Sequence, residues 1–279
     1  MTARTIETGT NHLLASVEER VATLTLNRPE RRNAFSNEML DGLARALQDA
    51  ERASDVGCVV ITGAGGAFSA GGDVKGMNER NTGDRAPREE VGIDARIHAQ
   101  RLSQRETAGR IYAMPKPVIA ALPGAAAGAG FALALACDLR IAAENAVLVT
   151  SFARVGFSGD YGGTYFATQV VGAAKARELY YLSERVSAQE ALRIGLVNRV
   201  VPASELEKAT RELALRLASG PAVAYRYMKE NINRAAAGAD VFECLDLEAT
   251  HHVHTGLTED HREAARAFVE KREPTFRGR

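Results

Sequence analysis

The chain has few cysteines, and their spacing excludes the usual cysteine-based frameworks. It has only three, Cys58, Cys137 and Cys244, and none of them forms a CxxC pair. Disulfide-stapled domains and zinc sites both depend on closely spaced cysteines. We therefore expect neither disulfide bonds nor a bound metal, and we expect a cytoplasmic protein whose thiols stay reduced.

Net charge and targeting signals are lacking as well. The 35 Lys and Arg residues are balanced by 35 Asp and Glu residues, so no overall field attracts nucleic acid or anionic lipid. Met1 to Leu13 show neither the apolar run of a signal peptide nor the Arg-rich pattern of a transit peptide. These absences argue against a nucleic-acid partner and against a targeting segment.

One uncharged stretch has the length of a membrane span. It covers the 20 residues from Val118 to Cys137. Twelve of those 20 are Ala or Gly, and Pro123-Gly124 interrupts the run. The stretch therefore predicts a buried strand, a turn and a packed helix, and no membrane partner.

Strand patterns and helix patterns alternate along the chain, which predicts an α/β fold. The 279 residues correspond to one large domain or two modest ones at ~150 residues per domain. Alternating apolar residues over 12–18 and 21–26 predict a hairpin, and Ser36 is placed to cap a helix over 37–53. We expect further strands over residues 57–62, 117–122, 139–142 and 146–149, helices over 93–112, 128–136, 204–219, 221–236, 241–254 and 259–271, and a surface loop over 78–90.

Two glycine-rich turns, residues 69–75 and 124–130, each follow a predicted buried strand. Glycine lets backbone N–H groups approach a ligand closely, and a helix start adds partial positive charge. Two such turns together can form an oxyanion hole, although the same glycines also suit tight packing alone.

Two rival motifs fail at a defined position. Residues 63–68 begin like a dinucleotide-binding fingerprint but have Phe68 where glycine is required, and no GxxxxGK[ST] loop occurs. Residues 156–160 begin like a nucleophile elbow around Ser158 but end in Asp160 instead of glycine. Nucleotide binding and serine hydrolysis are therefore disfavoured.

A series of ordered motifs identifies a family. They are residues 27–35 (NRPERRNAF), 59–63 (VVITG), 68–77 (FSAGGDVKGM), 116–120 (KPVIA), 137–140 (CDLR), 162–164 (GGT), 187–191 (SAQEA), 195–198 (GLVN) and 267–272 (AFVEKR). With them the chain resembles the enoyl-CoA hydratase/isomerase (crotonase) superfamily from about residue 12 to its end. The resemblance implies a crotonase (ClpP-like) spiral of ββα units over residues 1–200, which holds the active site, and a C-terminal helical trimerisation region over residues 201–279.

The resemblance also implies the ligand, the assembly and the binding residues. The partner is an acyl-CoA thioester, with coenzyme A as part of the substrate and no tightly bound cofactor, and the protein is a homotrimer or a hexamer (dimer of trimers). The thioester oxygen lies between the backbone amides of Gly72 and Ala129. The residues implied for coenzyme A are Ala70, Asp73, Val74 and Lys75 around the adenine, and Arg28 and Arg32 at the phosphates.

The chain departs from the family's hydratases at the two acid–base positions. By ungapped alignment Ala132 and Phe152 stand where those enzymes carry glutamates, and both are expected to line the acyl pocket instead. Asp160 is the replacement, and it resembles the aspartate of dienoyl-CoA isomerases, epoxyphenylacetyl-CoA isomerases and aromatic acyl-CoA dehalogenases. Burial in an apolar pocket would raise its pKa and suit it to proton transfer. The alternative is that Asp160 only caps the helix that begins near Gly162.

Two tyrosines and the histidines are further candidates near the active site or on the surface. Tyr161 and Tyr165 are expected beside Asp160, where they either bind a ring-bearing acyl group or pack in the core. His98 is either a second active-site group or a surface residue, and His251 with its neighbouring histidines suits an exposed helix face.

The sequence therefore predicts an acyl-CoA enzyme in which Asp160 shuttles a proton, with isomerisation of an unsaturated or cyclic acyl group as the reaction. A hydratase or hydrolase in which Asp160 activates water is the first alternative. A non-catalytic CoA-ester-binding protein, which the missing glutamates would suit, is the second.

Overall fold

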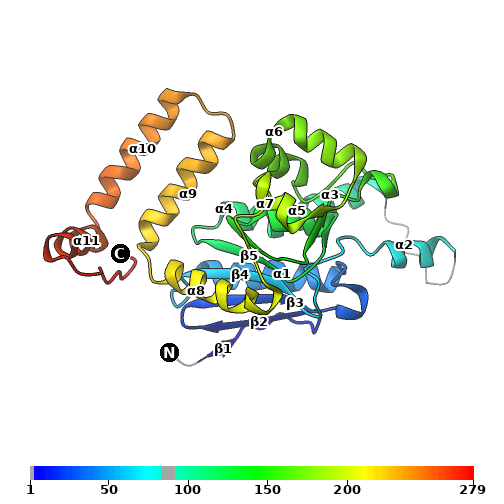
Figure 1. Cartoon of the computed structure of the whole chain (residues 1–279), viewed down its shortest axis with the longest axis horizontal. Coiled ribbons are helices and arrows are strands. Elements are labelled where there is room, and N and C mark those ends of the chain that lie inside the picture. The colour runs from blue at the N-terminus through cyan, green and yellow to red at the C-terminus, as the bar shows by residue number, and fades with distance from the viewer. Residues whose placement is uncertain (1–2, 83–91) are drawn as a thin grey trace.

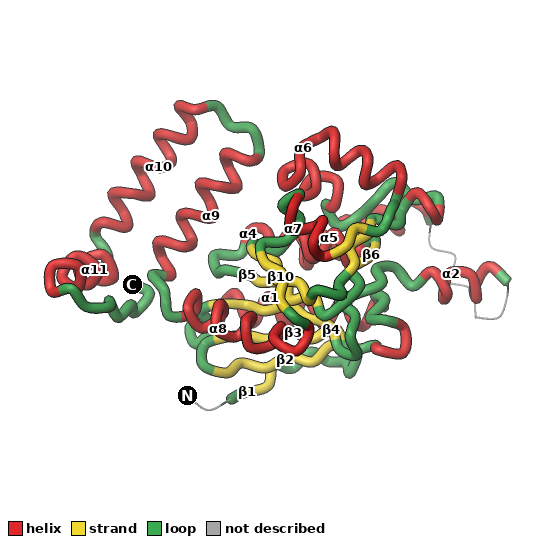
Figure 2. The backbone as a smooth tube through the Cα atoms, viewed as in Figure 1, coloured by secondary structure: helices red, strands yellow, loops and turns green. Residues whose placement is uncertain are grey.

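A twisted seven-stranded sheet forms the centre of the molecule (Figures 1 and 2). The structure, a computed structural model, describes residues 3–82 and 92–279. The predicted hairpin is confirmed: β2 (Leu13–Glu18) pairs antiparallel with β3 (Val21–Leu26), and β3 then pairs parallel with β4. The sheet order is β1 (Arg4–Thr5), β2, β3, β4 (Cys58–Gly63), β5 (Val118–Leu122), β7 (Leu139–Ala143) and β10 (Arg199–Val201).

Both faces of the parallel strands are buried, which explains their unbroken apolar sequences. In β4, Val59 and Ile61 face the larger core, whereas Cys58 and Val60 face a smaller core beneath α8 (Leu206–Ala218). Gly57 allows this approach, because a Cβ there would lie 2.6 Å from the carbonyl oxygen of Ala218.

Other helices pack against the face of the sheet opposite α8 and enclose the larger core. Ser36 caps α1 (Asn37–Arg52) by accepting a hydrogen bond from the amide of Met39, as predicted. The remaining helices are α2 (Val74–Asn81), α3 (Ile93–Gln104), a π-helical segment (Arg105–Gly109) that continues into α4 (Arg110–Ala113), α5 (Ala129–Ala136), α6 (Gly163–Leu182), α7 (Ala188–Arg193), α9 (Ala222–Ala236), α10 (Val241–Gly256) and α11 (Glu259–Glu270).

A second sheet of three short strands lies beside α5. It consists of β6 (Ala126–Ala127), β8 (Val147–Val149) and β9 (Val186–Ser187). The uncharged stretch from Val118 to Cys137 thus contains β5, β6 and α5, and it is packed core as predicted. Among residues 3–82 and 92–279, no helix has both the length and the apolar character needed to cross a membrane.

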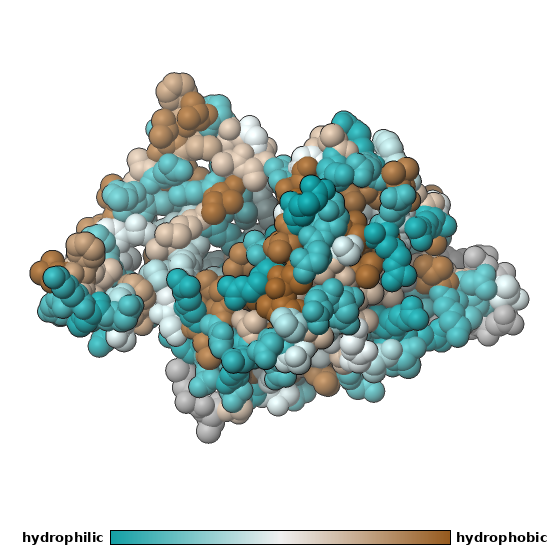
Figure 3. Space-filling view, viewed as in Figure 1, coloured by the Kyte–Doolittle hydropathy of each residue, from teal (hydrophilic) through white to brown (hydrophobic). Residues whose placement is uncertain are grey.

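The helices α9 to α11 extend away from the sheet (Figure 1). Lys229 on α9 ties them back, because its ammonium group donates to Asp138 at 2.9 Å and to the carbonyl of Ile111 at 2.8 Å. Figure 3 shows apolar side chains at the tip of the α9–α10 hairpin, where Phe242 is 73% exposed.

Two expectations from the sequence were wrong. The predicted loop over 78–90 begins too early, because α2 continues to Asn81; the part of it from residue 83 onward lies outside the described residues. His251 does not lie on an exposed face. It is buried between α9 and α10, with its Nδ1 2.6 Å from Asn231 Oδ1 and its ring stacked on Tyr227.

Candidate active site

The two glycine turns meet side by side. The amide of Ala127 donates to the carbonyl of Ser69 at 2.8 Å, and the amide of Ser69 donates to the carbonyl of Ala125 at 3.1 Å. Gly71 lies at the closest approach, with φ of +78°. A Cβ at Gly71 would lie 2.5 Å from the oxygen of Ala127 and 2.8 Å from the amide nitrogen of Ala129, so only glycine fits between the turns.

Two amides at this junction, those of the buried Ala129 and the half-buried Gly72, have no acceptor among the described residues. The amide of Gly71 donates to Ser69 Oγ at 3.0 Å and that of Gly128 to the carbonyl of Val149 at 3.0 Å. For Gly72 and Ala129 no hydrogen bond from the amide to any described residue is found. Since buried N–H groups are almost always paired, the unpaired amide of Ala129, together with that of the half-buried Gly72 in the adjacent turn, points to an external acceptor. The start of α5 at Ala129 adds partial positive charge there.

Asp160 lies in the loop that leads into α6, and its backbone is held firmly. Tyr161 has φ of +49°, and its amide donates to Gln104 Oε1 of α3 at 2.7 Å. The amide of Gly163 donates to the backbone carbonyl of Asp160 at 3.0 Å. The capping alternative is therefore wrong, because the Asp160 carbonyl and not its carboxylate supports the start of α6.

The Asp160 carboxylate has no hydrogen-bond partner in the described part of the chain, and its Oδ1 is buried. Burial raises the pKa of Asp160 from 3.8 to about 6. A carboxyl group of this kind exchanges protons near neutral pH, as the sequence predicts for a proton carrier.

Ala132, Phe152 and Tyr180 surround the same loop. The Tyr180 ring stacks on Phe152 with centroids 5.8 Å apart. A Cβ at Gly163 would lie 2.4 Å from the Tyr180 hydroxyl and 2.8 Å from the Ala132 Cβ. The two apolar replacements predicted to line the acyl pocket thus lie close to the Asp160 loop. The sequence did not single out Tyr180, because an aromatic residue in a helix normally signals core packing.

The coenzyme-binding candidates lie along one side of the first glycine turn. Arg28 is engaged within the protein: its guanidinium donates to the carbonyl of Ala34 at 2.7 Å and to Asp73 at 3.4 Å. Burial works against ionisation of Asp73, but the amide of Gly76 and the Arg28 charge outweigh burial and lower its pKa.

Arg32, Val74 and Lys75 are exposed, with Val74 and Lys75 in the first turn of α2. The amide of Ala70 donates to the carbonyl of Arg32 at 2.9 Å, which joins this turn to the segment after β3. The cationic groups of Arg32 and Lys75 are not in any ion pair with a described residue. They are the charged groups of this set that remain available to an anionic ligand.

The remaining candidates are placed as follows. Tyr161 packs edge-on against Phe35, and its hydroxyl lies 3.2 Å from Ser103 Oγ. The Tyr165 hydroxyl lies 3.2 Å from that of Tyr112, in a groove of about 400 Å³ beneath α9. His98 is exposed on α3. Tyr161 is buried, which matches the core-packing alternative, whereas Tyr165 is exposed and does not pack in the core. An acyl-pocket role for either tyrosine stays a prediction.

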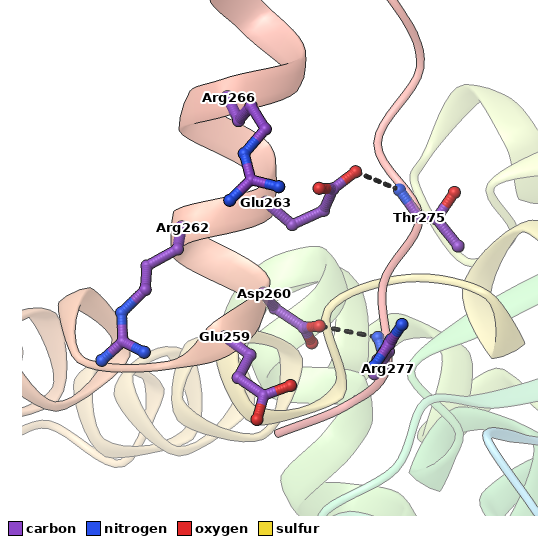
Figure 4. Close-up of a pocket in the computed structure, with 7 residues that line it drawn as sticks. All are labelled: Glu259, Asp260, Arg262, Glu263, Arg266, Thr275 and Arg277. Atoms are coloured by element: carbon purple, nitrogen blue, oxygen red, sulfur yellow. Dashed lines mark hydrogen bonds between the residues drawn. The ribbon is translucent and has the colours of Figure 1, made fainter.

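A separate polar cavity of about 440 Å³ lies between α11 and the C-terminal tail (Figure 4). The Asp260 carboxylate accepts the amides of Arg277 at 2.7 Å and Gly278 at 2.9 Å. These bonds hold the tail in place and involve none of the residues discussed above. In residues 3–82 and 92–279, no three His, Cys, Asp or Glu side chains are grouped so that they could hold a metal ion.

Comparison with known proteins gives consistent matches. The family model described as enoyl-CoA hydratase/isomerase matches residues 16–279. The chain is 38% identical over 267 residues to the 1,2-epoxyphenylacetyl-CoA isomerase of Escherichia coli, which covers 96% of this chain and 98% of that protein. It is 35% identical over 263 residues to the short-chain-enoyl-CoA hydratase of Clostridium acetobutylicum, covering 94% and 96%. A solved enoyl-CoA hydratase from Polaromonas sp. JS666 matches with a TM-score of 0.85 and 36% identity, covering 95% of this chain and 99% of that one.

Proposed function

The chain belongs to the enoyl-CoA hydratase/isomerase family, and from this premise we propose that it isomerises an unsaturated or cyclic acyl-CoA, with Asp160 as the proton carrier. The observation that carries the proposal is the Asp160 carboxylate, whose Oδ1 is buried and which has no hydrogen-bond partner in the described structure. Ala132 and Phe152 leave no second carboxylate at those positions. A carboxylate that acts alone suits removal and return of one proton better than the addition of water by paired acids.

In the proposed reaction the thioester oxygen accepts hydrogen bonds from the amides of Gly72 and Ala129. Asp160 then takes a proton from an acyl carbon, and the electron pair left behind moves toward the thioester oxygen as an enolate. Return of the proton from Asp160 to a different carbon completes the isomerisation. Preorganised donors of this kind are each worth roughly 10²- to 10³-fold in rate.

Coenzyme A is proposed to lie along the exposed side of the first glycine turn. Arg32 offers a cation without an ion-pair partner in the described chain, so we assign it to the phosphates, and Lys75, which is likewise without an ion-pair partner there, stays assigned to the adenine end. Ala70 and Val74 border the adenine. Arg28 and Asp73 form an ion pair with each other, and this pair stabilises the glycine turn against which coenzyme A lies.

A hydratase is the second candidate, because a relative with 35% identity is a short-chain-enoyl-CoA hydratase. In that case Asp160 would activate water. We favour isomerisation of a bulky acyl group because the protein named 1,2-epoxyphenylacetyl-CoA isomerase aligns over 96% of the chain at 38% identity.

The assembly is proposed to be a homotrimer or a dimer of trimers in the cytoplasm, with the C-terminal helices as the contact region. Apolar side chains on α9 and α10 remain uncovered in the single chain; Ile232 is 67% exposed and Phe242 73%. The predicted boundary near residue 200 stays a prediction, and α8 belongs with the sheet that it covers.

Exchange of acyl protons in heavy water tests the proposal. Purified protein is incubated in D₂O with phenylacetyl-CoA and, separately, with crotonyl-CoA. Deuterium incorporation into the acyl group without net addition of water supports an isomerase. Hydration of crotonyl-CoA without prior exchange would favour the hydratase, and absence of both reactions with tight binding would favour a CoA-ester-binding protein.

A further inference from the structure

The Tyr180 hydroxyl is a second buried polar group near Asp160 that has no partner. Tyr180 is 9% exposed, and its hydroxyl oxygen makes no hydrogen bond within the described chain. Buried tyrosine hydroxyls usually find a partner, because an unpaired one loses its hydration without compensation. The orphaned hydroxyl therefore needs an explanation of its own.

Asp160 does not supply the missing bond. Its negative charge acts on Tyr180 and, after burial, is the second cause that raises the pKa of the phenol. Yet the carboxylate and the hydroxyl are not hydrogen-bonded, and Asp160 Oδ1 is itself unpaired. Two neighbouring groups that each lack a partner are satisfied together when a third polar atom enters between them.

Apart from Asp160, the side chains found against Tyr180 are apolar and offer no hydrogen-bond partner. The Tyr180 ring edge would lie 3.2 Å from a Cβ at Gly159, and its hydroxyl 2.4 Å from a Cβ at Gly163. Phe152 covers the ring face, and Ala132 offers only a methyl group. The Tyr180 hydroxyl therefore has a hydrogen that no neighbouring side chain accepts. Because its raised pKa keeps it protonated, it can donate this hydrogen to an acceptor from outside the protein.

We propose that Tyr180 determines substrate specificity by donating a hydrogen bond to an oxygen atom on the acyl group, next to the carbon that exchanges its proton with Asp160. The oxygen belongs to a hydroxyl, a carbonyl or a cyclic ether of the acyl chain. This inference rests on the proposed function, and it narrows the substrate class from unsaturated or cyclic acyl groups to oxygen-bearing ones. A site that pairs a buried donor with a substrate oxygen discriminates against analogues that leave the donor unpaired.

The test compares Tyr180→Phe with Tyr181→Phe, a matched control in which the next residue along α6 is 75% exposed. Dissociation constants are measured by calorimetry for two pairs of CoA thioesters. One pair is phenylacetyl-CoA and (2-hydroxyphenyl)acetyl-CoA, and the other is butyryl-CoA and 3-hydroxybutyryl-CoA. Tyr180→Phe retains the ring that stacks on Phe152, so it removes only the hydroxyl.

We expect Tyr180→Phe to weaken binding of the oxygenated member of at least one pair by roughly 2- to 12-fold, with its hydrocarbon partner unchanged and the control like wild type. Equal losses for both members, or no loss in either pair, would overturn the assignment. If binding of both members weakens equally and the pH midpoint of proton exchange also shifts, the result indicates that Tyr180 binds a water molecule next to Asp160 and not a substrate oxygen. Failure of the wild-type protein to bind any of the four thioesters would instead refute the proposed function itself.

A second measurement covers the case in which Tyr180→Phe does not fold. Wild-type protein with tyrosine labelled at ¹³Cζ is titrated with each pair of thioesters. A resonance that moves with the oxygenated member and not with its partner supports the hydrogen bond, and identical spectra for the two members contradict it.

Discussion

Replacement of Asp160 by asparagine separates the catalytic value of this carboxyl group from its cost to stability. Asparagine has the same shape but cannot accept a proton at neutral pH. Because a positioned general base contributes typically ~10²- to 10⁴-fold, we expect deuterium exchange into the acyl group to slow by that factor. Thioester binding should persist, since the amides of Gly72 and Ala129 are untouched.

The same substitution should make the protein more stable at pH 8. Burial raises the pKa of Asp160 from 3.8 to about 6, and each pKa unit corresponds to about 1.4 kcal/mol. The ceiling is therefore ~3 kcal/mol, and partial access to solvent reduces it, so we expect a gain of about 1–3 kcal/mol. The folded chain holds its proton more tightly than the unfolded chain. The cost of the ionised aspartate consequently grows from pH 4 to pH 6, is constant above pH 6, and vanishes below pH 4.

Urea unfolding of both proteins at pH 8 and pH 4, at one protein concentration, measures the difference. Asp73→Asn is the matched control, because ionisation of Asp73 is favoured and its carboxylate contacts Arg28. Loss of that charged hydrogen bond should destabilise the protein by roughly 1.5–3 kcal/mol at pH 8, the opposite sign. If Asp160→Asn retains full exchange activity, Asp160 is not the proton carrier. If the substitution destabilises the protein at pH 8, the ionised carboxylate does not lower the stability of the fold.

The pH dependence, the junction of the glycine turns and the anchoring of α9 can each be tested separately. The rate of acyl proton exchange should rise with pH to a plateau, with its midpoint near 6, because only ionised Asp160 accepts a proton; a midpoint near 4 would contradict the burial argument. Gly71→Ala should slow exchange by ~100-fold or more, because its Cβ would separate the two donor turns, whereas Gly66→Ala, with the same φ of +78° and nothing within 4 Å, should retain the rate. Lys229→Met should cost roughly 3 kcal/mol in thermal or urea unfolding, because it leaves Asp138 unpaired under α9; a change below about 0.5 kcal/mol would show that the ion pair does not hold α9.

Local patterns predicted the elements that have clear periodicity or a clear cap. The hairpin of β2 and β3, the Ser36 cap and the buried strands β4 and β5 are confirmed at nearly their expected bounds. The strands that the sequence did not indicate, β1, β6, β9 and β10, have two or three residues each. Such short segments show no period, and their pairing partners come from distant parts of the chain.

The buried site depends on contacts that local patterns do not encode. Arg28 was assigned to the phosphates by family resemblance, but in the fold its guanidinium is already bound to Asp73 and to a backbone carbonyl. His251 has helical spacing typical of an exposed face, yet the packing of α10 on α9 buries it. In each case a partner distant in sequence decides what the side chain can do.

The sequence alone provided the family resemblance, the main helices and strands, the two glycine turns, and Asp160 as the acid that replaces the two missing glutamates, because each of these depends on residue types and motifs along the chain. Only the tertiary structure decided that the amides of Gly72 and Ala129 lack acceptors in the described chain, that the Asp160 carboxylate caps no helix, and that Tyr180 lies against the same loop. The physical reason is that hydrogen-bond satisfaction and burial belong to the packed molecule: whether a polar group is free to act depends on every neighbour that folding brings to it or withholds.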